Sequence, residues 1–397
     1  MRAADTLPLA GIRVLEFTHM VMGPSCGLVL ADLGAEVIKV EPLAGDNTRR
    51  LEGAGVGFFP VFNRNRRSLA VDLGRDEGRA IVLRLADRAD VLVENFRPGA
   101  LDRVGLGYEA LAARNPRLVY CSLKGFLPGP YEARVALDEV VQMMGGLAYM
   151  TGLPDRPLRA GASVVDILGG TFGAVAILAA LRARERSGRG MQVASALFET
   201  TAYVVAQHIA QYELTGEAPP PMSVKRPAWG VYDIFETADD RLFIGIVTDT
   251  QWQSFCREFG EAELAGDPRL ATNGARVRER AWLVPRLAAV FRRWPRAGLE
   301  AKLAAIGLPY APIAKPWDLL EDPHLLASGG LVETRRTDGK RFHAPALPLA
   351  FDGKRLAKRS DPPAVGEGAR EILAALGYSV DEIARLAAER IIALPDA

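Results

Sequence analysis

One carboxylate stands inside the most apolar stretch of the chain. Asp166 lies between the runs 162–165 (ASVV) and 167–170 (ILGG). An acid in such surroundings has a pairing, capping or catalytic role, because a buried lone charge is very costly. If a helix begins here, its N-terminus would keep the carboxylate ionised and the glycines would leave room for a substrate beside it. An ionised, held carboxylate is a usable nucleophile, so an N-cap and a catalytic role are both open for Asp166.

Basic and amide side chains gather where predicted strands end, at 63–67 (NRNRR), at 95–99 (NFRPG) and at Arg134. Charge runs are usually solvated, but at sheet ends they could supply the cations and amides that phosphate groups need. His19 follows the first predicted strand, where a parallel-sheet protein has its ligand crevice. None of the four histidines has metal-ligand spacing to another His, Cys or carboxylate, so we expect no metal site.

Several common sites are missing from the sequence. The turn after the first predicted strand, 18–24, reads THMVMGP and lacks the GxGxxG glycines that let a dinucleotide pyrophosphate approach a helix. A Walker A loop and a GxSxG nucleophile elbow are also absent. With 49 Lys and Arg against 48 Asp and Glu, the net charge of +1 favours neither nucleic acid nor an anionic membrane as a partner.

The cysteines and the termini indicate a cytoplasmic protein. The three cysteines contain no CxxC pair and no disulfide framework, which is typical of a reducing compartment. Residues 1–9 lack the long apolar run of a signal peptide. The stretch 164–181 contains Asp166 and several glycines, which favours a core helix over a membrane span.

The pattern of elements predicts where these residues lie. Short β-rich runs alternate with helical patterns in the first part of the chain, which indicates an α/β fold with a Rossmann-like parallel sheet. The predicted strands are 12–17, 36–40, 68–73, 90–93 and 118–123, and the predicted helices are 24–33, 76–88 and 172–185.

The length of 397 residues predicts two domains. The proline-rich stretch 217–227 indicates a linker, and a hairpin over 231–247 follows it. We expect a large domain over 1–224, a smaller α+β domain over 225–320, and a return segment, 321–397, whose helices complete the large domain. In that segment Ser379 and Glu382 form a capping-box pattern at the start of the last helix.

Together these stretches resemble the class III coenzyme A transferases, the family of formyl-CoA transferase and L-carnitine CoA-transferase. The motifs follow the family order nearly from end to end, at 8–18, 30–42, 65–68, 90–99, 115–120, 187–190, 307–312 and 376–379. The resemblance implies an interlocked homodimer, in which the chains of two-domain monomers thread through one another. It also implies that acyl-CoA and small carboxylic acids are the substrates and that no cofactor is bound permanently.

By this resemblance, Asp166 is the nucleophile and Asp138 is a supporting acid. The Asp166 carboxylate would attack the acyl-CoA carbonyl to form a mixed anhydride, which the CoA thiolate would convert to an enzyme-bound CoA thioester. An acceptor acid would reverse these steps. The implied CoA contacts are Val21, Met22, Val71, Asp72, Leu73, Gly74, Asn95, Phe96, Arg97, Arg103, Val135, Ala136 and Leu137.

The chain departs from formyl-CoA transferase at two places. The loop after the first strand has Val21-Met22 where that enzyme has Gln-Ser, and its tetraglycine loop has no counterpart near 226–230 (RPAWG). Both changes touch the acyl site, which disfavours formate and oxalate. The α-methylacyl-CoA racemase branch has a His-Asp pair at Leu137-Asp138, and leucine cannot exchange a proton. A racemase-type or other acyl-CoA enzyme and a non-catalytic CoA-binding protein are the alternatives to a transferase.

The chain is most similar to the family branch that acts on short dicarboxylates such as itaconate, mesaconate and succinate. The stretches 124–126 and 138–146 carry this similarity, and succinyl-CoA is the expected donor. A dicarboxylate needs a cation for its distal carboxylate. His19, Lys225 and Arg226 are the candidates, although each could equally be a surface residue.

Overall fold

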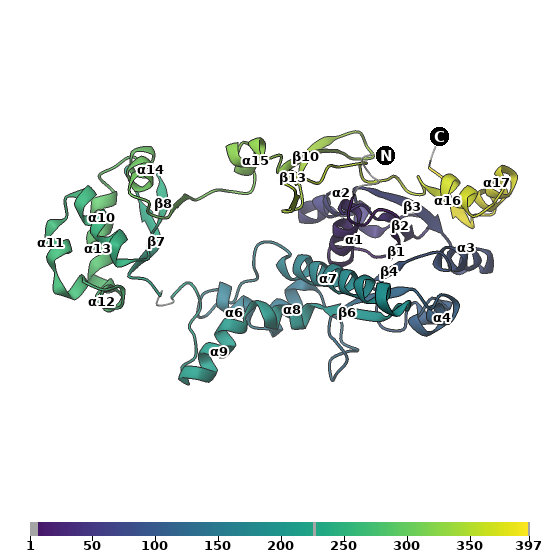
Figure 1. The fold of residues 1–397 in the computed structure, drawn as a ribbon, viewed down its shortest axis with the longest axis horizontal. Coiled ribbons are helices and arrows are strands. Elements are labelled where there is room, and N and C mark those ends of the chain that lie inside the picture. Colours follow the sequence, from purple (N-terminus) through teal and green to yellow (C-terminus); the bar gives the residue numbers. More distant parts are fainter. Residues whose placement is uncertain (1–6, 225–227, 396–397) are drawn as a thin grey trace. The chain divides into compact units, whose positions relative to one another are not determined.

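The computed structural model describes residues 7–224 and 228–395 (Figure 1). The chain divides into two compact units. The first unit combines the chain up to Ser223 with the chain from Pro323 onwards, and the second unit is Val224–Asp322. The return of the chain after the second unit therefore completes the first one.

The first unit is built on a seven-stranded sheet with the order β14-β3-β2-β1-β4-β5-β6. Its strands are β1 (Arg13–Phe17), β2 (Glu36–Glu41), β3 (Arg66–Val71), β4 (Val91–Glu94), β5 (Val119–Lys124), β6 (Gln192–Ala196) and β14 (Ile392–Ala393). All neighbouring pairs are parallel except β14 with β3. The predicted parallel α/β sheet is thus correct, with one antiparallel edge strand that the sequence did not indicate. The order from β3 to β6 is that of a Rossmann sheet, whose ligand crevice lies between β1 and β4, where the strand order reverses.

The predicted strand 68–73 is shifted by two residues. Arg66 pairs with Val37 and Ala70 pairs with Glu41, which places the strand at Arg66–Val71. Asp72 then accepts the N–H of Gly74 at 2.8 Å and turns the chain out of the sheet. Asp72, Leu73 and Gly74 therefore form a loop at the carboxyl end of β3.

Helices cover both faces of the sheet, because the strands are apolar on both sides. In β1, Leu15 and Phe17 belong to one buried cluster and Val14 to the other. The first cluster packs under α3 (Asp76–Ala86), α4 (Tyr108–Arg114), α16 (Ala369–Ala375) and α17 (Val380–Ala388). The second packs under α1 (Met22–Asp32) and α7 (Val164–Ser187), which lie side by side in Figure 1. The unit also contains α2 (Phe58–Phe62), α5 (Asp138–Met144), α6 (Leu147–Thr151), α8 (Leu197–Val204), α9 (Ala206–Thr215) and α15 (Pro323–Ala327).

The glycines after Asp166 serve helix packing. A Cβ at Gly170 would lie 2.3 Å from the carbonyl oxygen of Met22 in α1, and one at Gly173 would lie 2.5 Å from Leu123. The expectation that Gly169 and Gly170 leave room for a substrate was therefore wrong, because both are buried where α7 approaches α1. Among the described residues, α7 is the one helix long and apolar enough to span a membrane by length and composition. Its glycine face is occupied by α1.

The second unit is α+β. Its antiparallel sheet has the order β7 (Val231–Glu236), β8 (Arg241–Ile246) and β9 (Tyr310–Pro312), with the predicted hairpin between the first two. The helices are α10 (Asp249–Phe259), α11 (Ala262–Gly266), α12 (Asn273–Arg278), α13 (Arg280–Phe291) and α14 (Arg296–Ala305). They enclose a core in which Trp252, Phe255 and Phe291 are fully buried.

The return segment is anchored to the sheet by polar contacts. It contains the hairpins β10 (Leu331–Arg335) with β11 (Arg341–Pro345) and β12 (Ala350–Phe351) with β13 (Lys354–Arg355). Asn65 binds the backbone N–H groups of Arg359 and Ser360 at 2.6 and 2.8 Å. At the start of α17, Ser379 and Glu382 form the predicted capping box.

Candidate active site

Asp166 is the third residue of α7, in the first turn of the helix, and is not its N-cap. Ser163 stands at the cap position but makes no side-chain capping bond. Asp138, the first residue of α5, caps α7 in place of Ser163. Its Oδ2 accepts the N–H groups of Val165 at 3.0 Å and Asp166 at 3.2 Å. The first turn of a helix leaves such N–H groups without partners. The structure thus brings the two predicted acids together, with Asp138 holding the backbone of Asp166.

Asp138 is itself held from the opposite side. Its Oδ1 accepts hydrogen bonds from Gln142 Nε2 at 2.6 Å and from Arg159 Nη2 at 3.0 Å. Gln142 is fully buried, and its Oε1 accepts the N–H of Ala160 at 2.9 Å. The loop that carries Arg159 is therefore fixed against α5, and the guanidinium forms an ion pair with the Asp138 carboxylate.

Burial raises the pKa of Asp166 to about 7, the negative charge of Asp138 adds to the rise, and Arg159 opposes it. The expectation that the helix N-terminus keeps Asp166 ionised was wrong. The N–H groups of Val165 and Asp166 already donate to Asp138, so they are not available to stabilise a charge on Asp166. A pKa raised into the neutral range lets the Asp166 carboxyl group exist in both its protonated and its ionised form near neutral pH, which is typical of catalytic acids and bases.

The crevice between β1 and β4 forms a second set of contacts. Asn95, after β4, bridges to the backbone of His19, after β1: its Oδ1 accepts the His19 N–H at 3.0 Å and its Nδ2 donates to the His19 oxygen at 2.9 Å. The His19 ring stacks on Phe96 with 5.5 Å between centroids. A pocket of about 250 Å³ adjoins this crevice, and its lining comes from Thr18, His19 and Met20 after β1, from residues at and after the end of β2 that include Asp46, and from Phe96 after β4.

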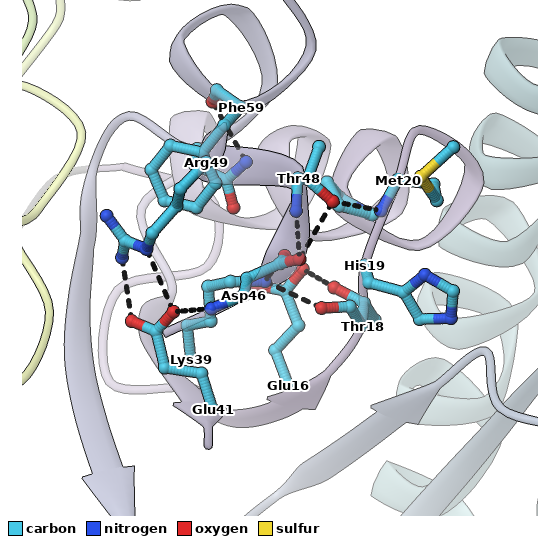
Figure 2. A network of polar contacts seen from close by, with 12 residues as sticks. Glu16, Thr18, His19, Met20, Lys39, Glu41, Asp46, Thr48, Arg49 and Phe59 are labelled. Atoms are coloured by element: carbon cyan, nitrogen blue, oxygen red, sulfur yellow. Dashed lines mark hydrogen bonds and ion pairs between the residues drawn. The ribbon is translucent and has the colours of Figure 1, made fainter. Parts of the chain in front are cut away.

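A buried polar network lies behind this pocket (Figure 2). Lys39 Nζ donates to the Thr18 oxygen at 2.6 Å and pairs with Asp46 Oδ2 at 3.0 Å. Burial lowers the pKa of His19, with Asp46 opposing and Lys39 adding to the shift. A cationic role for His19 towards a distal carboxylate is therefore disfavoured near neutral pH, where its imidazole is mainly uncharged.

The other predicted contact residues lie at the carboxyl end of the sheet, in the segments 21–22, 71–74, 95–103 and 135–137 at or after the ends of β1, β3, β4 and β5. The side chains of Val21, Met22 and Val71 are buried, so these residues offer a ligand mainly backbone groups. Half-buried positions are Asp72, Leu73, Asn95, Phe96 and Ala136, and exposed positions are Gly74, Arg97, Arg103, Val135 and Leu137. Lys225 and Arg226 lie outside the described residues.

The close approach of α1 links the crevice to Asp166. A Cβ at Gly23 would lie 3.0 Å from Asn95 Cγ, and the Met22 side chain would lie 2.8 Å from a Cβ at Gly169. The start of α1 therefore packs against Asn95 of the crevice on one side and against α7, the helix that contains Asp166, on the other. One ligand that extends along the start of α1 could contact both sites.

Sequence reasoning missed five residues of these networks: Lys39, Asp46, Thr48, Gln142 and Arg159. The Asp46-Asn47-Thr48 pattern is typical of a side-chain cap, and Asp46 does cap the turn Asn47–Arg50. Gln142 follows Asp138 by four positions on one helix face, which is also a readable signal. Nothing in the sequence around Arg159 pointed to its role. Within 7–224 and 228–395, no group of three His, Cys, Asp or Glu side chains is placed to hold a metal ion.

The model of CoA-transferase family III matches residues 9–369. The chain belongs to this family. It is 35% identical over 382 residues to the succinate–glutarate CoA-transferase of Agrobacterium fabrum, covering 93% of this chain and 96% of that one. It is 36% identical over 395 residues to the succinyl-CoA–D-citramalate CoA-transferase of Chloroflexus aurantiacus, covering 97% and 98%.

A solved structure of similar fold is that of a CaiB/BaiF family protein from Brucella suis. It has 37% sequence identity and a TM-score of 0.82, with 93% of this chain and 99% of that chain covered. The resemblance drawn from the sequence motifs is confirmed, and this family III protein is a CoA-transferase.

Proposed function

We propose that this family III enzyme transfers coenzyme A from succinyl-CoA to a short dicarboxylic acid through a CoA thioester on Asp166. The observation that carries the proposal is the half-buried Asp166, whose pKa is raised to about 7 and whose backbone is held by Asp138. The succinate–glutarate and D-citramalate enzymes are relatives whose names describe transfer between dicarboxylic acids.

The proposed reaction balances without a redox partner or an external proton. The ionised Asp166 oxygen attacks the thioester carbonyl, the C–S bond breaks, and CoA leaves as a thiolate. This thiolate attacks the Asp166 carbonyl of the mixed anhydride and releases the donor acid as a carboxylate. The acceptor carboxylate then attacks the Asp166 thioester, and the second released thiolate attacks the acceptor carbonyl. The products are a new acyl-CoA and a regenerated Asp166 carboxylate.

The nucleotide end of CoA is proposed to lie in the crevice between β1 and β4. The switch point of a parallel sheet is the usual place for such ligands. Asn95 and Phe96 border it, and the exposed Arg97 and Arg103 follow β4 and could neutralise phosphate charge. The thioester end would then extend along the start of α1 towards Asp166.

The decisive experiment is an exchange assay with radiolabelled CoA between succinyl-CoA and a panel of carboxylic acids. Label in a new acyl-CoA supports a transferase. Isomerised acyl-CoA without exchange would support a racemase-type enzyme, and binding without reaction would support a CoA-binding protein. Either of the last two results would overturn the proposal.

The pH dependence of transfer should follow Asp166, because only its ionised form is a nucleophile. We expect kcat/KM to fall as the pH drops through about 7. Arg159→Met removes a charge that lowers the Asp166 pKa, so the acidic limb should move to higher pH. Asp138→Asn removes a charge that raises the pKa, so the limb should move to lower pH.

The matched control for these pH profiles is Arg182→Met on the exposed part of the same helix, where Arg182 pairs with Glu185. Its profile should match the wild type. Shifts of the same sign in the Arg159 and Asp138 variants would contradict the assignment, because the two charges act on Asp166 in opposite directions.

We also propose that the enzyme is an interlocked homodimer. No residue of α9 is buried, although Ile209, Tyr212 and Leu214 are apolar or aromatic and exposed. Tyr203 of α8 is 70% exposed and Leu214 is 86% exposed. Large exposed apolar surfaces of this kind mark interaction sites, and a second copy of the chain is the partner that the family resemblance implies.

Dilution followed by light scattering tests the dimer. If the cores are shared, the mass should stay that of a dimer until the protein unfolds, because stability and assembly are then inseparable. Circular dichroism on the same samples reports unfolding. A folded monomer at low concentration would be incompatible with an obligate interlocked dimer.

A further inference from the structure

We infer that Asp46 and Thr48 are positioning residues that set the turn Thr18-His19-Met20 against bound acyl-CoA. The turn forms one wall of the crevice pocket, and the loop containing Asp46 and Thr48 lies beside it. The inference rests on the proposed CoA site and adds to it two residues that are not expected to touch the reacting atoms.

The backbone of the turn is held by side chains from other segments. Thr48 Oγ1 accepts the N–H of Met20 at 2.9 Å, and Lys39 Nζ donates to the oxygen of Thr18 at 2.6 Å. Asn95 binds both backbone groups of His19. Four hydrogen bonds therefore reach three consecutive residues, which fixes the direction in which the His19 ring leaves the turn.

Asp46 connects two of these holding groups. Its Oδ1 accepts from Thr48 N at 2.9 Å and Thr48 Oγ1 at 2.8 Å, and its Oδ2 pairs with Lys39. Figure 2 shows Asp46 at the centre of the network, with the His19 ring pointing away from it. Because the Thr48 hydroxyl donates to Asp46, its lone pairs remain free to accept the Met20 N–H. Asp46 thus orients the hydroxyl that holds the turn.

The turn needs this support because Met20 has a positive φ of 62°. A residue other than glycine is strained in the left-handed region, and such a conformation persists only where the surroundings impose it. Lys39 and Asp46 are both buried, and a buried ion pair adds little net stability. Imposing the geometry of the turn is therefore the expected use of the network.

The loop is anchored on its far side as well. Glu41 accepts the N–H of Asp46 at 2.7 Å and binds Arg49 through Nε at 2.9 Å and Nη2 at 2.7 Å. The Arg49 guanidinium lies 3.8 Å from the centre of the Phe59 ring. Glu41 and Arg49 therefore fix the loop on the side opposite the turn, which holds Asp46 and Thr48 in position to bind the turn.

Thr48→Val tests the inference, because valine has nearly the same shape but cannot accept the Met20 N–H. We expect the KM for succinyl-CoA to rise about tenfold, the effect of one hydrogen bond to a buried group. The value of kcat should change less than about threefold, since the contacts of Asp166 with Asp138 are untouched. Thr48→Ser keeps the hydroxyl and should restore most of the affinity.

The matched control is Thr237→Val in the second unit. Thr237 also binds a neighbouring acid, Asp239, at 3.1 Å and accepts a backbone N–H, that of Asp240, at 2.9 Å. This control should leave KM and kcat as in the wild type. A similar rise of KM in both valine variants would indicate a general loss of stability and would overturn the inference.

The position of His19 provides a readout that does not depend on turnover. In NMR spectra of the imidazole groups, with His19→Gln to assign the signal, Thr48→Val should shift the His19 resonances and Thr48→Ser should restore them. If the wild type transfers CoA but Thr48→Val leaves the His19 signal or the KM unchanged, the inference is overturned and the proposed function stands. A wild type without transfer overturns the proposed function and this inference with it.

Discussion

Asp166→Asn should lose at least about three orders of magnitude in kcat for CoA transfer, and Asp166→Ala should lose as much. Neither side chain can form the anhydride or the CoA thioester, and loss of a covalent nucleophile typically costs this much or more. The measurement is radiolabelled CoA exchange at pH 8, where the wild-type carboxylate is mostly ionised. A variant that keeps more than a small fraction of the wild-type rate would show that Asp166 is not the nucleophile.

The stability of the Asp166→Asn variant provides the control. We expect this variant to lose activity and yet to be more stable towards unfolding than the wild type at pH 8. The pKa of Asp166 is about 7 in the folded protein and near 3.8 in the unfolded chain, so the folded state disfavours the charge. The contribution of Asp166 to the stability of the wild type is therefore lost as the pH rises from about 4 to about 7. Asparagine is uncharged throughout, so the variant should match the wild type near pH 4 and exceed it at pH 8.

The gain at pH 8 should be on the order of 1–3 kcal/mol, because one pKa unit corresponds to about 1.4 kcal/mol and partial relaxation reduces the full conversion. Thermal unfolding across this pH range measures it. A variant that is less stable than the wild type at pH 8 would contradict the raised pKa. An unchanged oligomeric state would confirm that the lost activity does not reflect misassembly.

A dicarboxylate acceptor of four or five carbons should be preferred over the matching monocarboxylate by roughly 30- to 150-fold in kcat/KM. A distal carboxylate paired with a cation in a closed site contributes on the order of 2–3 kcal/mol, since hydrogen bonds to charged groups are the strong ones. A neutral pocket would instead favour the monocarboxylate, because an unpaired buried charge is costly.

The measurement is a paired comparison of succinate with butyrate and of itaconate with its monoacid analogue, with succinyl-CoA as donor. Equal rates within a pair, or a preference for the monoacid, would rule out the dicarboxylate acceptor and leave the transferase assignment standing. Among the candidate cations, the His19 imidazole is mainly uncharged near neutral pH, and Lys225 and Arg226 lie outside the described residues. Substitution of Lys225 and Arg226 by methionine would distinguish them, because only the pairing cation should lower the dicarboxylate rate selectively.

Much of the fold was readable from local patterns. The alternation of β-rich runs and helices predicted β1, β2, β4, β5, α1 and α3 to within a few residues, because a strand buried on both faces reads as a continuous apolar run. The capping box of α17 was also predicted, because its two residues, Ser379 and Glu382, are only three positions apart in the sequence. The predicted start of α7 was late by several residues. Its cap comes from Asp138, which lies 27 and 28 positions before the two residues whose N–H groups it accepts and so gives no local signal.

Residue types in a fixed order were enough to predict the transferase family, the parallel sheet, and Asp166 and Asp138 as candidate catalytic acids. The protonation of Asp166 and the contact between the two acids depend on the tertiary structure. Burial and the charge of Asp138 raise the pKa of Asp166, and neither property exists in the unfolded chain. The fold likewise decided that Gly169 and Gly170 serve helix packing and that Thr48 holds Met20, since both depend on distances between segments that are remote in sequence.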